Sequence, residues 1–139
     1  MQSIKNTDFY NDVLKELNYS FGNVFILSGV IISEMNEGVV FSWEEHASQI
    51  VKDVINFTGS DGSDIVYISH RINSYSVVPT DWLKFFKNFS LKGYGIVCYK
   101  NVGFFNVVIE NLFFTKKIRK FGNLEEALLW VKFLDTVET

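Results

Sequence analysis

Six polar side chains fall within seven consecutive residues, just before the only proline of the chain. They are an imidazole, a guanidinium, an amide, two hydroxyls and a phenol: His70, Arg71, Asn73, Ser74, Tyr75 and Ser76. Together they offer hydrogen-bond donors suited to a small anion or to a polar group of a protein partner. A structural role is the alternative, in which the amide and hydroxyls satisfy backbone groups of a long turn and Arg71 pairs with an acid.

The same stretch contains the residue types of a nucleophilic triad, His70 with Ser74 or Ser76 and Asp81. The sequence lacks the Gly-x-Ser-x-Gly elbow and any recognisable oxyanion device, so a hydrolase is the weakest reading. His46 lies beside Glu44 and Glu45 but is too far in sequence from other potential ligands to indicate a metal site, and the glycines form no phosphate-loop or dinucleotide pattern. We therefore expect no catalytic residue, no metal and no cofactor.

Composition favours one folded domain of moderate charge. The chain has 139 residues, 47% of them hydrophobic, and a net charge of -3, which argues against a nucleic-acid binder. Cys98 is the only cysteine and lies in an apolar run, so we expect a buried, unreactive thiol. With no signal-peptide core and no apolar run near the ~20 residues that span a bilayer, we expect a cytoplasmic protein without stable membrane insertion.

Short β-branched runs alternate with amphipathic stretches along the chain. We predict strands at 24–27, 30–35, 64–69, 94–99 and 117–121, and helices at 7–17, 42–57, 80–89, 102–114 and from 124 onward. This rhythm is typical of an α/β domain with a mixed, mostly parallel sheet that begins with a β-hairpin. We treat 1–18 as an N-terminal helical extension and 19–139 as a single domain. The loop after residue 69 then lies at the carboxyl end of a central strand, where such folds bind ligands.

Helix starts are marked by two capping signals. Ser42 and Glu45 form a capping box, in which Ser42 accepts from the Glu45 amide and the Glu45 side chain reaches back to the Ser42 amide. Asn123 is expected to cap the last helix, whose inner face includes Trp130.

The segment 102–114 is apolar on more than one side. It either packs broadly on the sheet, or exposes an apolar surface of Phe104, Phe105, Ile109 and Phe113 to a partner, a lipid or a second copy in a homodimer. An apolar-ligand or lipid carrier built from the aromatic helices around Phe85, Phe86 and this segment is thus the main alternative to a polar binding module.

The predicted element order resembles the SpoIIAA-like (STAS) fold. The strings 34–41 (EMNEGVVF), 67–76 (YISHRINSYS) and 81–86 (DWLKFF) are similar to small bacterial STAS/SEC14-type proteins. The resemblance covers roughly residues 19 to 135, and it implies a mixed sheet whose first strand is antiparallel to its neighbour. It also implies a non-enzymatic binding or signalling module.

In anti-sigma-factor antagonists of this fold, a phosphorylatable serine follows a central strand, next to a helix N-terminus. Ser74 and Ser76 are the nearest candidates in this chain. The chain departs from the family pattern, because no Asp directly precedes either serine and the loop is longer before its helix begins.

Overall fold

The computed structural model describes residues 2–73, 75–77, 81, 84, 90–98 and 118–137. Within them lie β1 (Lys15–Tyr19), β2 (Gly22–Leu27), β3 (Val30–Met35), β4 (Val40–Phe41), α1 (Ser48–Thr58), β5 (Val66–Arg71), β6 (Ser76–Val77), β7 (Gly93–Cys98), β8 (Ile118–Phe121) and α4 (Leu124–Val137). A π-helical turn, Trp43–Ala47, leads into α1.

Six strands form one mixed sheet in the order β1-β2-β3-β5-β7-β8. The β1–β2 and β2–β3 pairs are antiparallel, and the three remaining pairs are parallel. A small parallel sheet of β4 and β6 lies beside it. The α/β class, the β2–β3 hairpin and the position of β8 at an edge of the described sheet are therefore confirmed. The specifically STAS-like arrangement stays a prediction.

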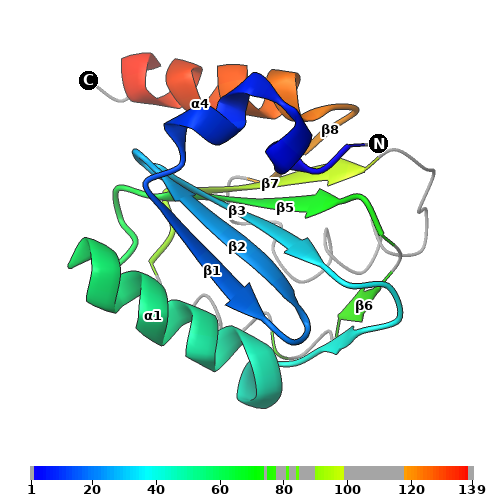
Figure 1. Cartoon of the computed structure of the whole chain (residues 1–139). Helices are drawn as coiled ribbons and strands as arrows, with labels where there is room; N and C mark the ends of the chain where they lie inside the picture. Colours follow the sequence, from blue (N-terminus) through cyan, green and yellow to red (C-terminus); the bar gives the residue numbers. More distant parts are fainter. Residues whose placement is uncertain are drawn as a thin grey trace.

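The sheet is covered on both faces (Figure 1). α1 lies on one face, whereas α4 and the N-terminal segment, residues 2–14, lie on the other. Alternate residues of each strand feed the two cores, as a pleated strand requires. In β2, for example, Val24 and Ile26 pack toward α1, and Phe25 and Leu27 pack toward α4.

β7 has two glycines that lie against the Trp130 side chain of α4. A Cβ atom on Gly93 would lie 3.0 Å from Cη2 of Trp130, and one on Gly95 would lie 3.4 Å from Cζ3 of the same ring. These glycines leave room for the indole, which is 9% exposed and lies 5.4 Å from the ring of Phe121. The predicted inward direction of Trp130 is confirmed.

The helix that we predicted over residues 7–17 is wrong. The N-terminal segment contains two 3-10 turns, Ile4–Asn6 and Asp8–Asp12, and β1 follows. Residues 15–19 pair with β2 in antiparallel register, so strand pairing outweighs the helical spacing of their apolar side chains. β1 also crosses residue 18, where we had placed the domain boundary.

The capping predictions are confirmed except for one bond. Ser42 Oγ accepts from the Glu45 amide at 3.2 Å, and Asn123 Oδ1 accepts from the Glu126 amide at 2.9 Å. The Ser42 amide, however, donates to Nδ1 of His46 at 3.0 Å rather than to Glu45. The imidazole stacks on Phe41, which brings its nitrogen to the helix start.

Several predicted features lie outside the described residues. They are the segment 102–114 with Phe104, Phe105, Ile109 and Phe113, Ser74, and all of the predicted helix 80–89 except residues 81 and 84. Among the residues that are described, no helix is long and apolar enough to cross a membrane.

Candidate functional site

β5 extends further than its sequence pattern indicated. We expected a loop from His70 onward, but β5 continues through Arg71, and both residues are buried. Each pairs with β7, His70 opposite Val97 and Arg71 opposite Cys98. Sheet pairing therefore places the two most strongly polar side chains of the predicted loop inside the domain.

His70 and Arg71 point to opposite faces of the sheet, because neighbouring side chains of a strand alternate. Arg71 lies on the face covered by α1, with its Cζ 4.3 Å from the ring centroid of Tyr75. His70 lies on the face covered by α4. The predicted site is consequently divided into two groups of residues that do not share a surface.

The first group, which we call the carboxyl-end cluster, lies on the α1 face toward the carboxyl ends of β3 and β5. Its members are Ser33, Tyr67, Ser69, Arg71, Tyr75 and Tyr94. Ser33 and Ser69 are partners in the β3–β5 register. Tyr67 OH donates to Ser33 Oγ at 2.6 Å, and Ser69 Oγ is hydrogen-bonded to Tyr75 OH at 2.7 Å. The Tyr67 and Tyr94 rings stack at 5.3 Å.

Two tyrosines of the carboxyl-end cluster are held in the neutral form. Burial raises the pKa of Tyr67 above its usual value, and the hydrogen bond to Ser33 opposes this only in part. Burial likewise raises the pKa of Tyr94 well above its usual value, while the Arg71 guanidinium opposes the shift. The cluster is thus a set of neutral hydroxyls around one cation, and it reaches the surface at the half-buried Tyr75.

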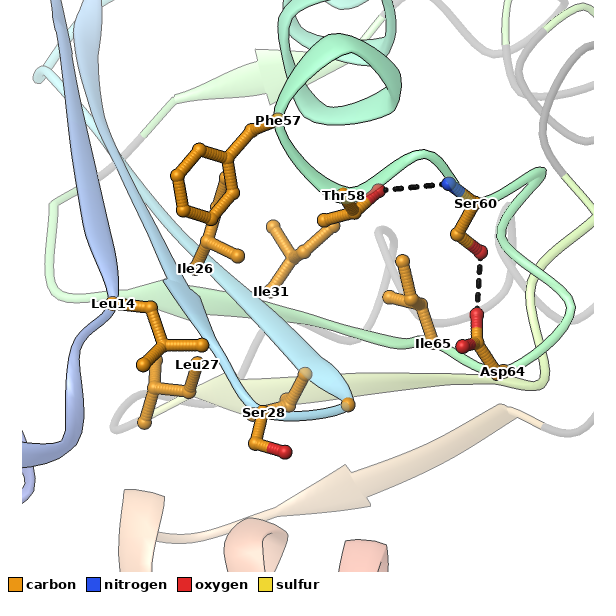
Figure 2. A pocket seen from close by; sticks show the side chains of 12 residues that line it. Leu14, Ile26, Leu27, Ser28, Ile31, Phe57, Thr58, Ser60, Asp64 and Ile65 are labelled. Carbon is orange, nitrogen blue, oxygen red and sulfur yellow. Dashed lines mark hydrogen bonds between the residues drawn. The ribbon is translucent and has the colours of Figure 1, made fainter.

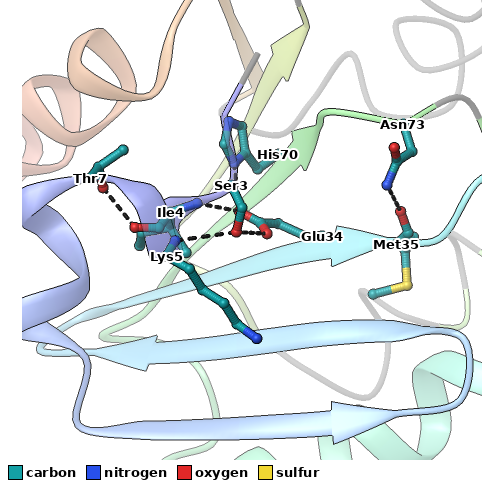
Figure 3. Close-up of polar contacts among 8 residues, drawn as sticks. All are labelled: Ser3, Ile4, Lys5, Thr7, Glu34, Met35, His70 and Asn73. Carbon is teal, nitrogen blue, oxygen red and sulfur yellow. Dashed lines mark hydrogen bonds and ion pairs between the residues drawn. The ribbon is translucent and has the colours of Figure 1, made fainter.

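The second group, which we call the Glu34 network, joins the sheet to the N-terminal segment (Figure 3). Glu34 Oε2 accepts from the Ile4 amide at 2.7 Å and is hydrogen-bonded to His70 Nδ1 at 2.9 Å, and Oε1 accepts from the Ser3 hydroxyl at 2.6 Å. The side chains of His70 and Glu34 are 0% and 4% exposed.

Two further residues of the predicted site that the structure describes, Asn73 and Ser76, have structural contacts. Asn73 Nδ2 donates to the Met35 carbonyl at 3.1 Å, as in the structural alternative for this amide. Ser76 lies in β6, opposite Val40, and is exposed.

The described contacts do not assemble the triad of the hydrolase hypothesis. Asp81 Oδ2 accepts from the Trp43 amide at 2.7 Å, and the carboxylate that contacts His70 is Glu34. Within the described ranges, no group of three or more histidine, cysteine or acidic side chains could hold a metal ion.

Two pockets lie around the turn between β2 and β3, at the opposite end of these strands from the carboxyl-end cluster. The hairpin pocket, about 230 Å³, opens on the α1 face beside Phe57, Thr58 and Ser60 (Figure 2). The N-terminal pocket, about 670 Å³, opens between the N-terminal segment and α4. Its lining comprises Phe9, Asn11, Asp12, Val13, Leu14, Leu27, Ser28, Val30, Glu125, Leu128, Leu129, Val131 and Lys132.

Sequence reasoning missed the partners of the predicted site residues. Glu34 was assigned only to a strand, although a carboxylate inside the apolar run 30–35 is a signal for a buried polar contact. Ser33 and Ser69 had no comparable signal, because only the β3–β5 register brings them together.

Comparison of the chain with protein-family models, curated proteins and solved structures found no match. Its resemblance to STAS-like proteins accordingly remains a prediction from the sequence.

Proposed function

We propose that the protein is a non-enzymatic, cytoplasmic binding or signalling module of STAS-like type. The carboxyl-end cluster binds an anionic group, carried either by a small molecule or by a protein partner. The observation that carries this proposal is the position of Arg71 on the ring of Tyr75, beside the hydrogen-bonded hydroxyls of Ser69 and Tyr75.

The chemistry of the carboxyl-end cluster supports an anion over a cation. A guanidinium offers donors in a planar fork that matches carboxylate and phosphate oxygens. Serine and neutral tyrosine hydroxyls donate as readily as they accept, so they can turn toward an anion. The cluster also lies toward the carboxyl ends of parallel strands, the edge at which α/β sheets commonly bind ligands.

The contacts of His70 support a binding module over a hydrolase. His70 is bound to Glu34 on the other face of the sheet, away from Arg71. The carrier hypothesis for the aromatic helices concerns residues outside the described part of the chain, and stays a prediction together with the homodimer.

Thermal unfolding with added inorganic phosphate tests the proposal, with chloride at matched ionic strength as the reference. A ligand that binds only the folded state stabilises it by about 2.7 kcal/mol at 100 times its Kd. We expect phosphate to raise the Tm of the wild type, and to raise that of Arg71→Gln far less. Arg119→Gln is the matched control, because Arg119 is exposed on β8. Equal stabilisation of Arg71→Gln and the wild type would show that the carboxyl-end cluster is not the anion site.

A further inference from the structure

The N-terminal pocket lies away from the carboxyl-end cluster and has the character of a small-molecule site. Eight of its thirteen lining residues are apolar, and they come from three separate parts of the chain. The N-terminal segment supplies Phe9, Val13 and Leu14, the β2–β3 hairpin supplies two residues, and α4 supplies three. A volume of about 670 Å³ lies within the range of ligand pockets in proteins.

α4 presents a second apolar strip to this pocket. Its first strip, which includes Trp130, packs on the sheet. Leu128 and Leu129 belong to the second strip, between Glu125 and Lys132 at the i, i+3, i+4 and i+7 spacing of one helix face. Leu129 is 59% exposed, so the strip leaves apolar surface in contact with water that a ligand would cover.

The charges around the pocket favour an uncharged occupant. Asp12 and Glu125 are acidic, whereas Lys132 is basic, so the lining has no dominant sign that would attract an ion. The apolar walls, rather than a charge, would then supply the binding free energy.

One wall of the pocket is held in place by the Glu34 network. The N-terminal segment has only short 3-10 turns, which contribute little stability of their own. Ser3 and the Ile4 amide are bound to Glu34, and the Ile4 side chain is fully buried. These contacts anchor the segment a few residues before Phe9, where it becomes the pocket wall.

We propose that the N-terminal pocket binds one small, uncharged apolar molecule, and that the Glu34 network holds its N-terminal wall in the binding position. This site is separate from the carboxyl-end cluster, so it does not depend on the anion-binding proposal.

A fluorescence titration of the full chain with N-phenyl-1-naphthylamine, a neutral apolar probe, tests the site. We expect saturable binding of one probe per chain, weakened at least about tenfold by Leu129→Lys, which replaces apolar lining with a charge. Phe133→Lys is the matched control. Phe133 is 62% exposed on the same helix, one turn from Leu129, but does not line the pocket, so this variant should bind like the wild type.

A second pair of variants tests the wall. Ser3→Ala removes the hydrogen bond to Glu34 and the one that Ser3 Oγ accepts from the Lys5 amide, without touching the pocket, and we expect about three- to tenfold weaker probe binding. Ser48→Ala, which removes a hydrogen bond within the π-helix–α1 region, should leave binding unchanged. If Ser3→Ala binds as tightly as the wild type, the network does not hold the wall and that half of the proposal is wrong.

Two other results would overturn the site itself. One is probe binding that does not saturate, or that is weakened equally by Leu129→Lys and Phe133→Lys. The other is a wild type that does not bind the probe and that sedimentation analysis shows to be a dimer, with Leu129→Lys dissociating that dimer. This result would assign the pocket to a contact between copies of the chain.

Discussion

Replacement of Trp130 by alanine should remove much of the stability of the domain. The indole is 9% exposed, lies against Phe121 and covers the two glycines of β7. Large-to-small substitutions of buried aromatic residues cost about 3–5 kcal/mol, because burial is lost and a cavity remains. Typical domains have only about 5–15 kcal/mol of stability in total. We therefore expect Trp130→Ala to unfold at a much lower urea concentration than the wild type.

A double-mutant cycle with Gly93 makes the reasoning specific to this contact. A Cβ on Gly93 would lie 3.0 Å from Trp130 Cη2 and 3.3 Å from Leu134 Cδ1. Overpacking of this kind costs about 1–3 kcal/mol in the wild type. In the Trp130→Ala background the closer of the two neighbours is gone, so Gly93→Ala should cost less there, by about 0.5–3 kcal/mol.

Urea denaturation followed by circular dichroism measures all four corners of the cycle. With a slope of about 2 kcal/mol per M, Trp130→Ala should lower the midpoint by about 2 M. Phe133→Ala is the control on the exposed side of α4 and should change stability by less than about 0.5 kcal/mol. A loss below about 1 kcal/mol in Trp130→Ala, or strictly additive effects of the two substitutions, would refute the proposed packing of α4 on β7.

Two further predictions concern ionisation and helix capping. Burial raises the pKa of Tyr67 and Tyr94 in the folded state, so the folded chain keeps protons that the unfolded chain releases above about pH 10. The free energy of unfolding should therefore fall as the pH rises through this region, and tyrosinate absorbance should show both groups ionising only upon unfolding. Titration of the two tyrosines in the folded protein would contradict their burial. Ser42→Ala should lower the free energy of unfolding by about 1 kcal/mol, because the Glu45 amide loses its acceptor. Thermal unfolding measures this loss, and an unchanged Tm would show that the cap contributes no stability.

The features that the sequence predicted correctly have local signals. The turn at Ser28 and Gly29 needs a residue that tolerates positive φ, and Gly29 has a φ of 74°. The caps at Ser42 and Asn123 follow from short side chains placed before amphipathic stretches. Each signal lies within a few residues of the feature that it specifies, so neighbouring residues alone were sufficient to find it.

The features that sequence reasoning missed depend on contacts with other strands of the sheet. Residues 15–19 become a strand because β2 is available to pair with them. His70 is hydrogen-bonded to Glu34, 36 residues earlier. No local pattern identifies such a partner, since the contact exists only after β3 and β5 lie side by side.

The sequence by itself determined that this chain forms an α/β sheet and that polar residues gather near the end of its buried strand. Only the tertiary structure decided what those residues contact. Because side chains alternate along a strand, Arg71 lies beside the hydroxyls on the α1 face, whereas His70 contacts Glu34, which binds the N-terminal segment on the other face.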